Sequence, residues 1–230
     1  MRSELDRVDP GRSGSTLDIW VTGGGTREAI DDVRFVGNRS TGRLALAVTA
    51  AALRREHRVR LLLAADISVP AEHPNLKVDR YESATELLDR MLERPGPDAL
   101  VHAAAVADYA PQPISGKVPS GQDRWTLEMV RLPKLVDQFR RNNPESHLTM
   151  FKLESQITPE ELMERARVAA ARAGADQVFA NLLQEVGEDR HAGWLVSVEE
   201  AGGHERLEGR DTVAEALIRS VERSLAGESR

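Results

Sequence analysis

Short apolar segments alternate with helix-length segments along most of this chain, and that alternation limits the possible folds more than any other feature. Strands are expected at residues 17–22, 58–65, 76–81, 98–106, 147–153, 176–181 and 194–198. Helices are expected at 41–56, 83–94, from 158 onward, and 211–226. Neighbouring parallel strands need crossovers of about this length, and such crossovers are right-handed. The sequence therefore predicts an α/β fold, with a doubly wound, mostly parallel, Rossmann-like sheet and helices on both faces.

Two of the expected helices begin with capping patterns. Ser83 is followed three residues later by Glu86, which is the spacing of a capping box. Thr158 precedes Pro159, and Glu161 falls in the first turn that would follow. We therefore expect helices to start at these two points.

The length of 230 residues suits one large domain. We expect residues 1–16 to be a disordered tail and residues 17–230 to form a single domain. The segment at about 111–131 breaks the alternation, because Pro, Gly and Ser clusters surround one alternating run at 125–130. An arm or hairpin that projects from the sheet is the interpretation that fits this segment best.

Composition excludes several classes of function. A formal net charge of -6 disfavours nucleic-acid binding, and no apolar run reaches the roughly 18 residues of a membrane span. The chain has no cysteine, which excludes thiolate metal sites and suits a reducing cytoplasm. Its six histidines show no metal-ligand spacing, so no metal site is expected, and His102 is interpreted as a hydrogen-bonded core imidazole.

Three glycines, Gly23, Gly24 and Gly25, come directly after the first expected strand. Glycine lets the backbone turn sharply and bring its N–H groups close to a phosphate, although a tight turn without a ligand is an equal alternative. The dinucleotide fingerprint G-x-G-x-x-G fails, because its third glycine position is Glu28 and no helix is expected before about Thr41. Nicotinamide binding is therefore disfavoured.

The polar segment 26–42 is too long for an ordinary strand-to-helix connection in a compact domain. Its charged, amide and hydroxyl residues are Arg27, Glu28, Asp31, Asp32, Arg34, Asn38, Arg39, Ser40 and Thr41. The last two are expected at the helix start, where hydroxyls and free N–H groups make an anion site. Simple N-capping by the same residues is the alternative.

The string from Gly23 to Arg43, GGGTREAIDDVRFVGNRSTGR, resembles the signature loop of the phosphopantothenate-cysteine ligase family, the synthetase domain of the bifunctional coenzyme A biosynthesis flavoprotein. Further matches are AAAVADY at 103–109, Lys117 in the expected arm, FKLE at 151–154 and, more weakly, AN at 180–181. The resemblance extends from about residue 19 to residue 181.

The resemblance implies an enzyme that joins 4'-phosphopantothenate to cysteine. The phosphopantothenate carboxylate attacks the α-phosphate of CTP or ATP, and the cysteine amine then displaces the nucleotide from the acyl-nucleotide intermediate. Mg²⁺ would arrive with the nucleotide phosphates. The family also implies a homodimer in which the arm of one subunit reaches over the other; a hairpin folded on its own sheet is the alternative. Whether the companion decarboxylase is a separate chain stays open.

The resemblance also implies roles for individual residues, carried over position by position. Asn38 would hold the acyl carbonyl, Ala104 would contact the intermediate through its main chain, and Lys117 would contact the nucleotide phosphates. The catalytic residues would be Asn38, Lys117 and Arg34. The substrate-binding residues would be Asn38, Arg39 and Ala104. The nucleotide-binding residues would be Gly23, Gly24, Gly25, Ser40, Thr41, Gly42, Ala104, Asp108, Lys117 and Phe151.

The nucleotide half of the family pattern is less complete than the acyl half. The flap keeps one lysine, the usual Asn-Pro-Asp reads LPK at 132–134, and the acidic residue after Asn181 is Leu182. Two further family lysines would fall near Ala169 and Ala173. Nearby arginines at 165, 167 and 172 could compensate, or could form a solvated helix face. Two other functions stay open: a non-catalytic relative that binds a phosphopantetheine-like ligand or a protein, and an NAD(P)-binding oxidoreductase.

Overall fold

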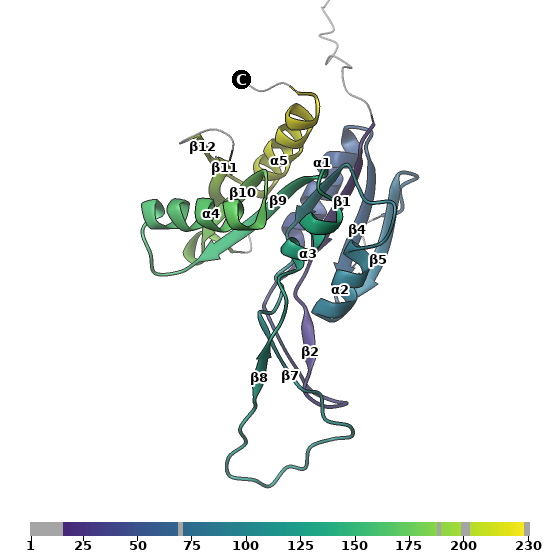
Figure 1. Cartoon of the computed structure of the whole chain (residues 1–230), viewed down its shortest axis with the longest axis vertical. Helices are drawn as coiled ribbons and strands as arrows, with labels where there is room; N and C mark the ends of the chain where they lie inside the picture. Colours follow the sequence, from purple (N-terminus) through teal and green to yellow (C-terminus); the bar gives the residue numbers. More distant parts are fainter. Residues whose placement is uncertain (1–15, 69–70, 188–189, 199–202, 228–230) are drawn as a thin grey trace, which may run out of the picture.

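The computed structural model describes residues 16–68, 71–187, 190–198 and 203–227. An eight-stranded sheet with the order β12-β11-β10-β9-β6-β1-β4-β5 forms its centre (Figure 1). The strands are β1 Asp18–Gly23, β4 Arg58–Ala64, β5 Leu76–Tyr81, β6 Ala99–His102, β9 His147–Glu154, β10 Gln177–Leu182, β11 Ala192–Ser197 and β12 His204–Glu208. The tail expected at 1–16 lies, apart from its last residue, outside the described residues.

Six neighbouring strands of this sheet, from β5 to β10, are parallel, and β11 and β12 add antiparallel pairs at one side. The chain runs outward from β1 to β4 and β5, and then returns to β6 on the other side of β1. The strand order therefore reverses between β1 and β6, which is where doubly wound sheets bind ligands. The predicted mostly parallel α/β sheet is confirmed.

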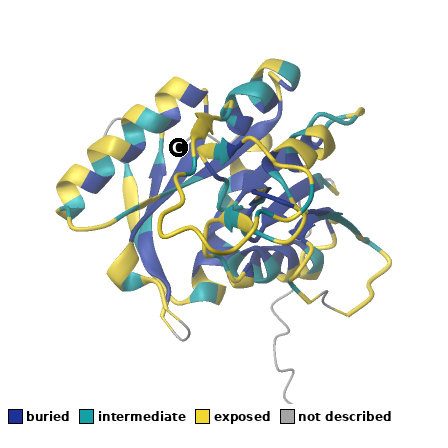
Figure 2. Cartoon of the chain, turned by 90° about the horizontal axis from the view of Figure 1, so that it is seen from below, coloured by how far each residue is buried: buried dark blue, intermediate teal, exposed yellow. Residues whose placement is uncertain are grey.

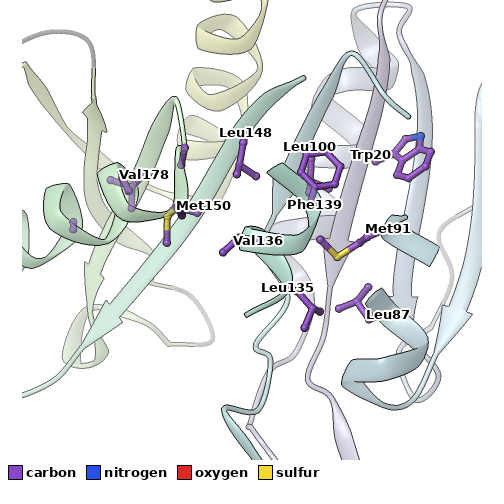
Figure 3. Packing of buried hydrophobic residues seen from close by; sticks show 14 of the residues in the cluster. Trp20, Leu87, Met91, Leu100, Leu135, Val136, Phe139, Leu148, Met150 and Val178 are labelled. Carbon is purple, nitrogen blue, oxygen red and sulfur yellow. The ribbon is translucent and has the colours of Figure 1, made fainter. Parts of the chain in front are cut away.

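Helices cover both faces of the sheet, as expected. They are α1 Arg43–Arg54, α2 Ala84–Met91, α3 Leu135–Asn142, α4 Pro159–Ala173 and α5 Arg210–Leu225, with a short 3₁₀ helix at Leu183–Glu185. One core cluster joins the sheet to α2, α3 and α4, and Figure 3 shows part of it. The other joins the sheet to α1 and α5. Among the described helices, none is long and apolar enough to cross a membrane.

Alternation along the strands divides their side chains between these two clusters. In β1, Ile19 and Val21 pack toward α1 and α5, whereas Trp20 between them packs on the opposite face. All three are buried, and each contributes about 1.5–3 kcal/mol of transfer free energy. Buried residues accordingly follow the sheet through the middle of the molecule in Figure 2. This rigid layer carries the loops at the strand ends.

Both helices start where the capping patterns predict, but only one of the two capping boxes is complete. Thr158 accepts the Glu161 N–H and the Glu161 carboxylate accepts the Thr158 N–H, so the box at the start of α4 is complete. At α2, Ser83 accepts the Glu86 N–H at 3.2 Å, but the Glu86 carboxylate accepts from the N–H of Glu82 instead. The second box is therefore only half formed.

Several boundaries differ from the sequence expectation. Strand β6 ends at His102 and not at 106, because residues 103–107 turn along the loop that follows β1. Helix α3 and strand β12 were not expected. Within the alternating run at 125–130, only the last two residues are extended and paired, as part of 129–131. Residues 125–128 have no regular structure.

An arm projects from the sheet, and two hairpins build it (Figure 1). The first lies inside the polar segment and pairs β2 Arg27–Ala29 with β3 Phe35–Gly37. The second pairs β7 Tyr109–Pro111 with β8 Met129–Arg131. Residues 112–128 connect β7 to β8 and are called the flap below. The arm is thus larger than the segment expected at 111–131.

Candidate active site

The loops after β1 and β6 run side by side at the point where the strand order reverses. Gly25 and Ala105 form a parallel bridge, and the Ala105 N–H donates to the Gly24 carbonyl at 2.8 Å. The Thr26 N–H donates to the Ala105 carbonyl at 3.3 Å. The β1–β6 pairing therefore continues beyond the strands, and the two loops form a firm platform at the edge of the sheet.

None of the three glycines has room for a side chain; a Cβ at Gly23 would lie 2.3 Å from the Ala45 Cβ. Gly24 has φ 99°, and a Cβ there would lie 2.4 Å from the Ala64 Cβ and 2.7 Å from the Ile67 Cδ1. A Cβ at Gly25 would lie 2.2 Å from the main-chain oxygen of Asn38. The glycine turn thus lets the segment that carries Asn38 approach the platform closely.

Asn38 lies against the loop that follows β6. Its amide Nδ2 donates to the Val106 carbonyl at 2.9 Å, and the residue is exposed. The buried Thr26 hydroxyl accepts the Ala107 N–H at 3.0 Å beside it. We call the glycine turn, Asn38 and the 103–107 loop the base of the site. Arg39 is exposed next to it.

A buried network fixes the peptide of Ala104. The Ala104 N–H donates to the Thr22 hydroxyl at 3.1 Å, and the same hydroxyl lies 2.9 Å from Nδ1 of His102. The hydroxyl thus links the Ala104 N–H to the His102 ring. Burial lowers the pKa of His102 to about 4, which keeps the ring neutral at pH 7. Any main-chain contact of Ala104 with a ligand therefore falls to its carbonyl.

Helix α1 begins at Arg43, two residues later than expected, and its N-cap is Gly42 with φ 66°. No side chain caps this end of the helix. The Ser40 hydroxyl accepts the Gly42 N–H at 3.4 Å, and a Cβ at Gly42 would lie 3.6 Å from the Gly24 nitrogen. The uncapped helix end thus lies beside the glycine turn, where the helix dipole favours an anion. Thr41 is exposed between these residues.

Asp108 directly precedes β7, and Phe151 lies within β9. The Asp108 carboxylate pairs with the Lys134 ammonium at the start of α3. Phe151 follows Met150, which is in register with His102, so its ring lies one strand away from the 103–107 loop. That ring is half-buried, with its centroid 5.8 Å from that of Phe179.

The two expected cations, Arg34 and Lys117, lie on the arm and not at the base. Arg34 donates to the Val118 carbonyl at 2.6 Å and lies over the Trp125 ring, 5.1 Å from its centroid. Lys117 is exposed beside Val118. Arg34 lies four positions before Asn38 along the hairpin, which places their Cα atoms about 14 Å apart at ~3.4 Å per extended residue. Within one subunit, the structure does not bring these cations to Asn38.

Comparison with known proteins identifies the family. The sequence model of the DNA/pantothenate metabolism flavoprotein C-terminal domain matches residues 15–225. The chain belongs to this family. The crystal structure of the DNA/pantothenate metabolism flavoprotein from Streptococcus pneumoniae aligns with a TM-score of 0.84 at 28% identity, covering 91% of this chain and 100% of that one. The resemblance noted in the sequence is thereby confirmed.

Curated members of the family are longer than this chain. The coenzyme A biosynthesis bifunctional protein CoaBC of Thermococcus kodakarensis is 34% identical over 209 residues, covering 90% of this chain and 51% of that protein. The protein of the same name from Mycobacterium tuberculosis is 30% identical over 221 residues, covering 91% and 53%. The chain therefore spans about half the length of these relatives.

Two of the three arginines of α4 form ion pairs. Arg165 lies 3.5 Å from the Glu154 carboxylate, and Arg172 lies 2.9 Å from that of Asp137. Both side chains are about half exposed. Ala173, near which a family lysine would fall, is buried in the core. This arrangement favours a solvated helix face over a set of nucleotide contacts. Among the described residues, no three His, Asp or Glu side chains gather as a metal site.

Three residues that shape the base, Thr22, Thr26 and Tyr81, carry no signal in the sequence. The Tyr81 hydroxyl donates to the Gly23 carbonyl at 2.9 Å and so holds the glycine turn from β5. The partners of these side chains are 58 to 82 positions away along the chain. No local pattern announces such contacts, so only the fold reveals them.

Proposed function

We propose that this chain is a phosphopantothenate-cysteine ligase that uses CTP or ATP. The observation that carries the proposal is the base of the site, which holds the Asn38 amide beside the Ala104 peptide and the uncapped start of α1. A carboxylate that becomes an acyl-nucleotide needs an amide donor at its carbonyl and N–H groups or cations at its phosphates. The base supplies the first, and the α1 end supplies part of the second.

The proposed reaction has two steps. The carboxylate of 4'-phosphopantothenate attacks the α-phosphate and pyrophosphate leaves; the amine of cysteine then attacks the acyl carbon and the nucleotide leaves. Asn38 uses the amide hydrogen that Val106 leaves free to hold the acyl oxygen. Arg34 and Lys117 would neutralise charge that develops on the phosphates, with Mg²⁺ bound to the nucleotide.

The position of these cations supports a homodimer in which each arm completes the site of its partner. Large apolar side chains that are 37–62% exposed are concentrated on the arm: Val33, Phe35, Tyr109, Ile114, Trp125, Met129 and Val130. Apolar surface of this kind marks an interface more often than a free surface. Sedimentation at micromolar concentration tests the dimer, and a monomer at all concentrations would contradict it.

Pyrophosphate release tests the activity. We expect release that requires 4'-phosphopantothenate together with CTP or ATP, and loss of most of it in Asn38→Asp, because a carboxylate cannot donate to an acyl oxygen. Thermal shifts with CTP, with ATP and without nucleotide identify the phosphate donor. Phosphopantothenate binding without pyrophosphate release from either nucleotide would instead indicate a non-catalytic relative.

The same proposal implies a cytoplasmic location, where CTP and ATP are available. We propose that a phosphopantothenoylcysteine decarboxylase takes up the product of this reaction.

A further inference from the structure

Main-chain and side-chain hydrogen bonds tie the flap to the β2–β3 turn, and the main-chain ones include a bond from the Ile114 N–H to the Ile30 carbonyl at 2.9 Å. The Val118 N–H donates to Oδ2 of Asp31 at 3.0 Å, and the Val118 carbonyl accepts from Arg34. The Gly116 N–H donates to Oδ2 of Asp32 at 3.1 Å, and the Gly116 carbonyl accepts the Asp32 N–H at 3.1 Å. Both polar groups of two alternate flap residues are therefore bonded to one turn.

Asp31 links the turn to the flap. Its Oδ1 accepts the N–H groups of Val33 at 2.9 Å and Arg34 at 2.8 Å, and its side chain has no exposed surface. Burial alone would raise the pKa of the Asp31 carboxyl, but hydrogen bonds from Val118, Val33 and Arg34 outweigh it and lower the pKa. The carboxylate is therefore charged at neutral pH, where it closes the turn and binds the flap at the same time.

Lys117 lies between the two anchored residues, Gly116 and Val118. We propose that Asp31 and Asp32 form a latch that fixes the flap on the first hairpin and so sets the position from which Lys117 acts. The role of Lys117 rests on the proposed function, whereas the latch itself does not. Asp31 and Asp32 are positioning residues, because they act through the flap and not on a substrate.

Tryptic cleavage after Lys117, without any substrate, tests the latch directly. Cleavage in a closed loop is limited by the fraction of molecules in which the loop opens. We expect cleavage about tenfold faster or more in Asp31→Ala and a smaller increase in Asp32→Ala. Asp123→Ala, which removes an exposed carboxylate from the same flap, is the matched control and should cleave like the wild type. If Asp31→Ala does not fold, Asp32→Ala decides.

Pyrophosphate release tests whether the latch positions Lys117. The Asp32 side chain bonds to the flap and not to Arg34, so Asp32→Ala should loosen the flap without disturbing Arg34. We expect kcat to fall several-fold while the thermal midpoint changes little. The effect of Asp32→Ala should nearly disappear in a Lys117→Ala background, because residues that act through one another are not additive. Unchanged cleavage in both aspartate variants would overturn the latch, and fully additive losses would overturn its positioning role. A wild-type chain without ligase activity would refute the proposed function, while cleavage would still decide the latch.

Discussion

Replacing Gly25 by alanine should damage the site through one defined contact. The new Cβ would lie 2.2 Å from the Asn38 carbonyl oxygen and 3.3 Å from its carbon, whereas ordinary contacts are at least about 3.4 Å. Either Asn38 or the glycine turn must therefore move by roughly 1 Å. Overpacking of this kind costs about 1–3 kcal/mol, which lowers the thermal midpoint by roughly 2–12 °C in a chain of this size.

The effect on activity should exceed the effect on stability. A displacement of about 1 Å in a positioned group reduces turnover by ~100-fold. Pyrophosphate release and thermal denaturation of Gly25→Ala measure the two effects, and Gly187→Ala is the control, because a Cβ there meets nothing within 4 Å. A Gly25→Ala enzyme with wild-type turnover and an unchanged thermal midpoint would refute the claim that the position of Asn38 requires glycine at residue 25.

Three further predictions test the pH response, the shared site and the helix α4. Burial lowers the pKa of His102 and of His147 to about 4. Below pH 6.5 the unfolded chain therefore binds more protons than the folded chain, and the urea midpoint of unfolding should fall as the pH drops from 6.5 to 4. A constant midpoint would contradict this. Asn38→Asp and Lys117→Ala subunits should each be nearly inactive alone. After subunit exchange, an equal mixture should recover about a quarter of wild-type turnover, because half of the dimers would carry one intact shared site. No recovery would exclude sharing. Arg165→Ala should leave the thermal shift by CTP or ATP unchanged, because Glu154 already pairs this exposed cation; a lost shift would make Arg165 a nucleotide contact.

Elements with strong local signals were predictable from the sequence. Strand β5 has the predicted bounds, 76–81, and Thr158 begins α4 through a complete capping box. Helix α3 was missed because its N-cap, Lys134, offers no capping side chain and its eight residues are mostly polar. Strand β12 was missed because it is an edge strand in which only Leu207 is buried. Both depend on tertiary packing, which overrides weak local preference.

An arm at about 111–131 was also foreseeable, but the β2–β3 hairpin that forms its other half was not. Glycines after a strand, followed by a long polar segment, predicted a functional loop, and the resemblance to the ligase family singled out Asn38 within it. The hairpin within that segment depends on the Asp31 carboxylate, which bonds to N–H groups two and three residues later and to Val118, 87 positions away. The local bonds are a recognisable turn pattern, but the distant one has no counterpart in the sequence.

The bridge between Gly25 and Ala105 makes the platform an extension of the sheet, whereas the cations lie out on the arm. In the proposed homodimer, inhibitors should therefore fall into two classes. A compound that engages only the platform would bind a single subunit with an affinity independent of protein concentration. A compound that also recruits Arg34 and Lys117 from a neighbouring arm would bind only the assembled pair, and it would itself drive assembly by mass action.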